Sequence, residues 1–176
     1  MAAIQFVRGQ VLPPSIYVDA NVASAFLYRS HIHYNAAATF FMEASAQTRK
    51  LFVSPLTMDE IWHTLMKTSH LITQGPVLKP TAFKSSKPNH VGPQVSSVDL
   101  ATRALLGLSS VTFCDAQPGA ALTNEATRVL KTHHLGPRDC FHYAVASLAG
   151  VAAFATIDSD FDALAATAPR LTILKV

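Results

Sequence analysis

Short apolar runs alternate along the chain with longer segments of helical periodicity, and this order restricts the possible folds more than any other feature. Five runs are predicted to be buried strands, namely Ser15–Val18, Leu51–Ser54, Val111–Cys114, Ala152–Thr156 and Leu171–Leu174. Between them lie four predicted helices, namely Tyr34–Thr48, Met58–Ile72, Leu122–Thr132 and Arg138–Ala149. Because such strands are buried on both faces, the sequence predicts an α/β fold, a three-layer α/β/α sandwich around a mostly parallel sheet.

One segment, at about residues 73–97, breaks this pattern. It contains four prolines together with serine, lysine and glycine, which argues against a regular helix. We interpret it as a Pro/Lys-rich loop inserted in a single domain spanning residues 1–176, because neither flank could close a sheet alone. No acidic residue lies between Glu60 and Asp99, whereas this interval contains Lys67, Lys79, Lys84 and Lys87. The lysines are typical of a solvated loop or of a flap that contacts phosphates, and both interpretations stay open.

Composition places the chain among globular proteins, since 49% of its 176 residues are apolar and only 14% are charged. It has no apolar run of the ~18 residues that a membrane span requires and no recognisable secretory signal. Cys114 and Cys140 lie in apolar stretches and are expected to be reduced and buried, so we expect a cytoplasmic protein. The net charge of +3 is compatible with a polyanionic partner.

Four acidic residues occupy related positions in this predicted fold. Asp19 and Asp158 follow predicted strands, whereas Glu60 and Asp139 lie where predicted helices begin. Each has a simple structural explanation: the aspartates could cap helices, and Thr57 with Glu60 has the spacing of a capping box. In a doubly wound sheet, however, the carboxyl ends of strands and the starts of the following helices share one edge. The four carboxylates are therefore expected to converge.

Such a cluster would need a cation. Two carboxylates about 4 Å apart repel by roughly 4 kcal/mol at an effective dielectric constant near 20, so they persist only with protonation or a bound ion. Hard oxygen ligands suit Mg²⁺ or Mn²⁺, which take further oxygens from phosphates. The chemistry that this arrangement favours is metal-assisted hydrolysis of a phosphodiester.

The motifs carrying these acids resemble those of the PIN-domain nucleases, and most closely the VapC-type toxins of toxin–antitoxin systems. The resemblance rests on four segments in order: Asp19–Asn21 after the first strand, Asp59–Ile61 in a central helix, Arg138–Ala146 opening an alanine-containing helix, and Thr156–Phe161, which matches T-x-D-x-D-F in full. It covers about residues 15–174. The chain differs in length, because VapC-type toxins are typically shorter and lack so proline-rich a stretch at about residues 73–97.

The resemblance implies a catalytic, metal-binding cluster of Asp19, Glu60, Asp139 and Asp158, with Asp160 as an additional or water-mediated ligand of Mg²⁺ or Mn²⁺. It further implies supporting residues, with Asn21 orienting Asp19 and with Thr156 or Ser159 forming hydrogen bonds in the site. Similar proteins are endoribonucleases that cut RNA such as tRNA or rRNA. Many form homodimers, and a small antitoxin protein usually neutralises them.

Other interpretations remain. A non-catalytic PIN-like module that binds RNA or protein is the main alternative. Arg128 and His133 have the R-x4-H spacing of the metal-independent HEPN ribonucleases, although the predicted strands contradict an all-helical fold. His63 and His70 lie seven residues apart on one predicted helix face but lack a convincing third metal ligand. Phosphatases that phosphorylate an aspartate have D-x-D after the first strand, where this chain has Asp19–Asn21.

Overall fold

A single parallel sheet forms the centre of the protein, whose structure is a computed structural model describing residues 3–74, 91–114, 119–167 and 171–176. Its strands lie in the order β1-β6-β5-β2-β3-β4, and all neighbours pair in parallel. The strands are β1 (Ile4–Gln5), β2 (Ser15–Val18), β3 (Lys50–Val53), β4 (Val111–Phe113), β5 (Ala153–Thr156) and β6 (Thr172–Lys175). The predicted α/β class with a parallel sheet is confirmed.

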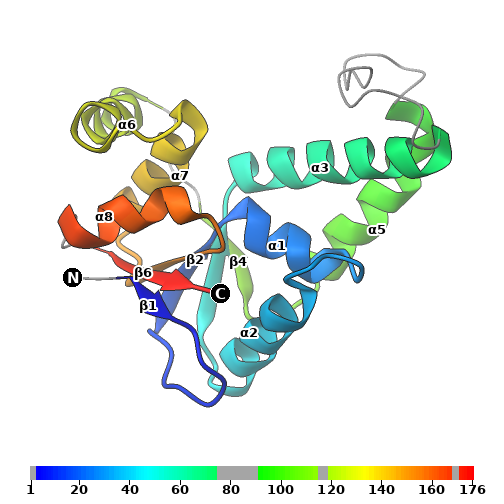
Figure 1. Ribbon diagram of the computed structural model, residues 1–176, viewed down its shortest axis with the longest axis horizontal. Coiled ribbons are helices and arrows are strands. Elements are labelled where there is room, and N and C mark those ends of the chain that lie inside the picture. The colour runs from blue at the N-terminus through cyan, green and yellow to red at the C-terminus, as the bar shows by residue number, and fades with distance from the viewer. Residues whose placement is uncertain (1–2, 75–90, 115–118, 168–170) are drawn as a thin grey trace.

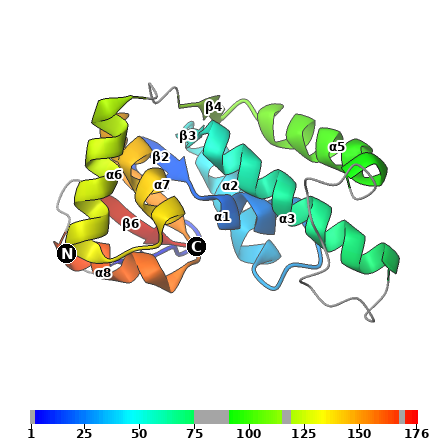
Figure 2. The ribbon, with the colours of Figure 1, turned by 90° about the horizontal axis from the view of Figure 1, so that it is seen from above.

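Helices cover both faces of this sheet (Figures 1 and 2). One layer comprises α1 (Ala20–Leu27), α2 (Tyr34–Ala46), α3 (Pro55–Gln74) and α5 (Val95–Leu106). The other comprises α6 (Ala120–His133), α7 (Pro137–Leu148) and α8 (Asp162–Thr167). The long helix α3 and its neighbour α5 extend together away from the sheet (Figure 1). None of the described helices is long and apolar enough to cross a membrane.

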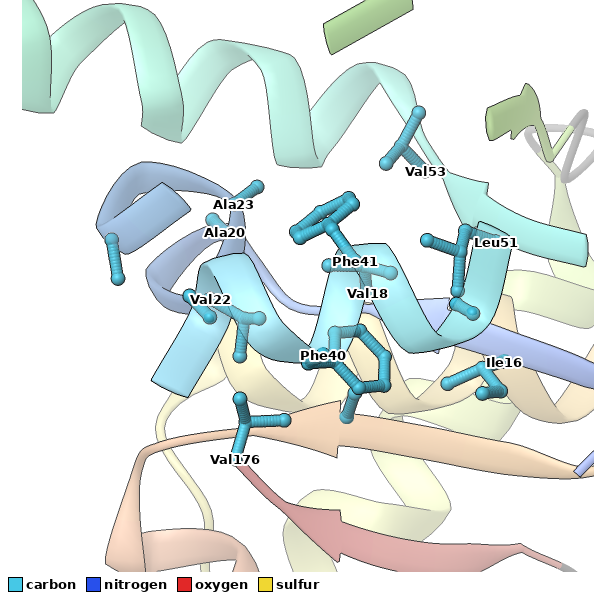
Figure 3. Packing of buried hydrophobic residues seen from close by; sticks show 14 of the residues in the cluster. Ile16, Val18, Ala20, Val22, Ala23, Phe40, Phe41, Leu51, Val53 and Val176 are labelled. Carbon is cyan, nitrogen blue, oxygen red and sulfur yellow. The ribbon is translucent and has the colours of Figure 1, made fainter. Parts of the chain in front are cut away.

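Successive residues of each strand pack into opposite layers. In β2, Ile16 and Val18 belong to the core cluster under α1 and α2, whereas Tyr17 belongs to the cluster under α6 and α7. Figure 3 shows the first cluster, in which Phe40 and Phe41 of α2 lie over the strands. Because both faces are buried, the strands are continuously apolar, which is the pattern that identified them in the sequence.

The strand order reverses at β2. The chain proceeds from β2 to β3 and β4 on one side, and later returns to place β5 and β6 on the other. At such a switch point the carboxyl ends of the two adjacent strands diverge and leave a crevice, where open α/β sheets bind ligands. Asp19 follows β2 and Asp158 follows β5, so these two aspartates lie at the two sides of this point.

Several elements differ from their predicted bounds. The sequence did not predict β1, α1 or α5, and η2 (Gly92–Gln94) precedes α5 with Pro93 in its first turn. The helices α3 and α5 enter both ends of the predicted loop at 73–97, because no helix breaker precedes Gln74 or follows Pro93. Residues 75–90 of that loop lie outside the described residues. Cys114 and Cys140 are buried, as expected.

Candidate functional site

Asp19 is the most buried carboxylate of the site, with only 4% of its surface exposed. It caps α1: Oδ1 accepts a hydrogen bond from the Ala20 backbone N–H at 2.7 Å, and Oδ2 accepts one from the Thr156 hydroxyl at 2.8 Å. Burial raises its pKa to about 6, and the charge of Glu60 adds to the rise, although His142 and these two hydrogen bonds oppose it. The capping role that the sequence suggested is therefore real, yet the fold holds this acid at an energetic cost.

Thr156 links Asp19 to the second side of the crevice. Its hydroxyl donates to Asp19 and accepts from the Asn21 side-chain amide at 3.3 Å and from the Asp158 backbone N–H at 3.0 Å. Asn21 Oδ1 in turn accepts from the Ile157 N–H at 3.3 Å. Asn21 therefore reaches the Asp19 carboxylate through Thr156 and fixes the chain where β5 ends.

Glu60 projects from the first turns of α3 and is not a capping residue. The capping box of this helix lies three residues earlier than predicted: Thr57 N–H donates to Ser54 Oγ, and Ser54 N–H donates to Thr57 Oγ1, both at 3.2 Å. The prediction of a Thr57–Glu60 box was wrong because Pro55, which suits a first helical position, starts the helix earlier. Glu60 is consequently available to the site.

Three further aspartates surround the same edge. Asp139 lies in the first turn of α7, and Asp158 caps the short helix η3 (Ser159–Phe161), its Oδ1 accepting from the Asp160 N–H at 2.9 Å. The pKa of Asp139 is raised first by burial, then by the charges of Asp158, Glu60 and Asp160, against the opposing effect of His142. Because the charges of Asp158, Glu60 and Asp160 all raise the pKa of Asp139, these four acids lie close enough to repel one another. Ser159, another predicted supporting residue, is exposed in η3.

Gly136 leaves space for the side chain of Asp139. A Cβ atom at this position would lie 2.7 Å from Asp139 Oδ2, well inside van der Waals contact. The backbone there is extended, with φ −56° and ψ 149°, as the following Pro137 favours, so no strain requires glycine. Glycine is needed here because the carboxylate of Asp139 lies back over the start of α7.

His142 belongs to the site and was not among the predicted residues. It lies on α7, three residues after Asp139, and its side chain is fully buried. Its Nδ1 atom lies 2.8 Å from the Tyr17 hydroxyl, and its Nε2 atom lies 3.2 Å from Glu60 Oε2. The i, i+3 spacing from Asp139, which puts both residues on one helix face, was the available sequence signal.

The acids and this histidine could hold a divalent cation. One ligand atom from each of Asp19, Glu60 and His142 lies within 4.8 Å of the other two. Glu60 is also within 3.5 Å of the guanidinium of Arg138, and its pKa is lowered, chiefly by its interaction with His142. Arg138 is 62% exposed, so its charge compensates the cluster only weakly. This donor set of two carboxylates and one imidazole could hold a metal ion.

The competing sites find less support. Arg128, of the R-x4-H pair with His133, is bound in bidentate geometry to Glu125, at 2.8 Å for both hydrogen bonds. The parallel sheet rules out the all-helical fold to which that pair would belong. The side chain of His70, and the predicted flap residues Lys79, Lys84 and Lys87, lie outside the described residues.

Comparisons with known proteins agree with this architecture. A comparison with protein families matches residues 16–167 to the PIN domain. The solved structure of VapC20 from Mycobacterium tuberculosis, a sarcin-ricin loop cleaving toxin, is 18% identical and has a TM-score of 0.52, over 84% of this chain and 93% of that one. VapBC2 from Rickettsia felis, solved with a DNA fragment from its promoter, is 9% identical with a TM-score of 0.57, over 92% and 98%. No curated protein matches the sequence. At these identities, the two structures establish a shared fold.

Proposed function

The chain belongs to the PIN domain family, and from this premise we propose that it is a metal-dependent endoribonuclease acting as the toxin of a toxin–antitoxin pair. The observation that carries the proposal is the cluster at the sheet's switch point, where Asp19 is buried with its pKa raised to about 6 and Asp139 also has a raised pKa. Carboxyl groups with raised pKa values reduce stability, so their grouping in one place indicates a functional site. The catalytic residues proposed are Asp19, Glu60, Asp139 and Asp158.

In this proposal the site residues have distinct tasks. Thr156 and the Ala20 N–H hold Asp19 in one orientation, and Asn21 holds Thr156. A Mg²⁺ or Mn²⁺ ion bound by the acids would polarise the scissile phosphodiester and activate the attacking water. Asp158 and the more exposed Asp160, together at the start of η3, would complete the oxygen ligands from the solvent side.

The proposed substrate is RNA, with tRNA and rRNA the first classes to test. The mildly basic chain, with a net charge of +3, is suited to a polyanion. At the site itself, the exposed guanidinium of Arg138 lies 3.5 Å from Glu60 and 3.9 Å from Asp59, and such a group can bind a phosphate. VapC20, which shares the fold, is a sarcin-ricin loop cleaving toxin. We place the protein in the cytoplasm, where these RNAs occur.

An antitoxin is the proposed protein partner, and a homodimer the proposed assembly. VapBC2, which also shares the fold, was solved with a promoter DNA fragment. A bound antitoxin must be removed before activity is measured, because it would cover the active site.

Cleavage is expected to require a divalent ion. The purified protein, freed of any bound partner, should cut tRNA or rRNA with Mg²⁺ or Mn²⁺, and EDTA should reduce the rate to background. Gel electrophoresis of end-labelled RNA measures this directly. Cleavage that persists in EDTA would contradict the proposed metal site. Binding of RNA without cleavage of either class, in either ion, would instead favour the non-catalytic PIN-like module.

Gly136→Ala is expected to lower the cleavage rate by about 10-fold to 100-fold, because the added methyl group displaces the Asp139 carboxylate. The free energy of unfolding should change by less than about 1 kcal/mol, since the backbone conformation suits alanine. Single-turnover cleavage and urea denaturation measure the two effects. Gly92→Ala is the matched control: it also precedes a proline, and its Cβ would have no atom within 4 Å. Equal rates for the two variants would show that Asp139 does not need its observed position.

A further inference from the structure

The imidazole of His142 is held by a closed set of buried hydroxyl groups. Tyr17 Oη lies 2.8 Å from His142 Nδ1, 2.7 Å from Ser54 Oγ and 3.0 Å from Thr57 Oγ1, and the last two atoms are 3.2 Å apart. All four side chains are buried. Burial keeps the pKa of Tyr17 above its usual value, so the residue stays a neutral phenol. The ring of His142 is therefore fixed in one orientation.

The Tyr17 hydroxyl can accept a hydrogen bond from a protonated Nδ1 of His142. If His142 Nδ1–H donates to Tyr17, the Tyr17 hydroxyl can donate to Ser54, Ser54 to Thr57, and Thr57 back to Tyr17. Every hydroxyl proton then has an acceptor. In this tautomer the lone pair of Nε2 faces the acidic cluster, as in histidines that bind metals through one nitrogen while the other is oriented by a hydrogen bond.

The Nε2 atom itself has no hydrogen-bond partner among the described residues, although it is fully buried. Glu60 Oε2 is 3.2 Å away, but its direction does not satisfy a hydrogen bond, and in this tautomer the Nε2 lone pair and the carboxylate repel each other unless a cation lies between them. Buried polar atoms without partners are rare in folded proteins and costly. Here the atom is aimed at Glu60 and Asp19, and the three residues present their ligand atoms within 4.8 Å of one another.

We propose that His142 is a direct metal ligand through Nε2, which gives the site an Asp19–Glu60–His142 ligand set and a preference for Mn²⁺ over Mg²⁺. The inference rests on the proposed function only for the presence of a divalent ion. Ligands about 2.1 Å from one ion lie ~3.0 Å apart when adjacent and ~4.2 Å when opposite. Because the three ligand atoms lie within 4.8 Å of one another, each pair needs to close by less than about 2 Å to bind one ion.

The preference follows from ligand chemistry. Mg²⁺ takes oxygen ligands in near-ideal octahedral geometry and keeps several waters, so a rigid imidazole nitrogen contributes little to its binding. Mn²⁺ also binds carboxylates well. As a transition metal it binds imidazole nitrogen better than Mg²⁺ does. An all-carboxylate site would lack this nitrogen contribution.

The test compares the protein with His142→Asn, using Mn²⁺ and Mg²⁺ as the probes. The asparagine amide can replace Nδ1 in the hydrogen bond to Tyr17 but has no atom at the place of Nε2. Pulsed electron paramagnetic resonance of bound Mn²⁺ is expected to detect a directly coordinated ¹⁴N in the unmodified protein and none in the variant. The Mn²⁺ affinity should fall about 10-fold or more, and the Mg²⁺ affinity less than about 3-fold.

Two controls make the outcomes distinct. His33→Asn removes an exposed histidine before α2 and should leave the ¹⁴N signal unchanged. Thermal unfolding followed by circular dichroism establishes that each variant is folded. Mn²⁺ that binds the unmodified protein and is released by Asp19→Asn, but has no coordinated ¹⁴N, would overturn the His142 inference and leave the proposed function standing. Failure of the unmodified protein to bind Mn²⁺ would overturn the His142 inference, and failure to bind either Mn²⁺ or Mg²⁺ would overturn the proposed function as well.

Discussion

Replacing Asp19 with asparagine is expected to lower the rate of RNA cleavage by about 1000-fold. A divalent ion contributes several kcal/mol to phosphodiester hydrolysis, and each ~1.4 kcal/mol corresponds to a factor of ten. Asp19 is the most buried of the proposed carboxylate ligands, and burial raises its pKa to about 6. Asparagine keeps one carbonyl oxygen for the hydrogen bond from the Ala20 N–H, but it has no charge to attract the ion.

The fold should survive this substitution, because asparagine caps helices about as well as aspartate. Cleavage of end-labelled RNA under single-turnover conditions gives the rate, and urea denaturation gives the stability. Asp99→Asn is the control, since Asp99 is exposed on α5 and pairs with Arg103 at 2.9 Å. A folded Asp19→Asn protein that cuts RNA at the unmodified rate would remove Asp19 from the active site. An unfolded one would assign it a structural role.

The parts of the fold that follow from local pattern were predictable. Strands buried on both faces consist of short apolar runs, and β2 was predicted at the bounds where the structure places it. The eight-residue helix α1 is too short and too uniformly buried to show a helical period, and β1 has only two residues. Such elements owe their existence to tertiary packing and not to a local signal.

The grouping of the acids was predictable as far as it depends on position along the chain. Asp19, Glu60, Asp139 and Asp158 come from elements whose starts or ends share one sheet edge, which topology alone requires. The contact of His142 with Tyr17 joins residues 125 positions apart in the sequence, so no local spacing could reveal it. The capping box shows the opposite case, because the local pattern of Thr57 and Glu60 offered a structural alternative for Glu60, whereas the box forms between Ser54 and Thr57.

At neutral pH and without metal, Asp19→Asn is expected to be more stable than the unmodified protein by about 3 kcal/mol. In the unfolded chain the Asp19 pKa is near 3.8, and in the folded protein burial raises it to about 6. Below pH 3.8 the carboxyl group is protonated in both states and costs nothing. As the pH rises the unfolded chain ionises first, so stability is lost progressively until the loss is complete above about pH 6. A shift of about two pKa units corresponds to roughly 3 kcal/mol.

Urea denaturation in EDTA at pH 4, 5, 6 and 7 measures this effect as the difference between the two proteins. The comparison is needed because Glu60, whose pKa is lowered, acts in the opposite direction and gains stability as the pH rises through its usual range. The difference should be small at pH 4 and largest at pH 7. Adding Mn²⁺ at 100 times its dissociation constant should then restore about 2.7 kcal/mol to the unmodified protein alone. A difference that is constant across this pH range would mean that Asp19 has the same pKa in the folded and unfolded protein. Ionised Asp19 would then not destabilise the metal-free fold, and a bound ion would have no such destabilisation to relieve.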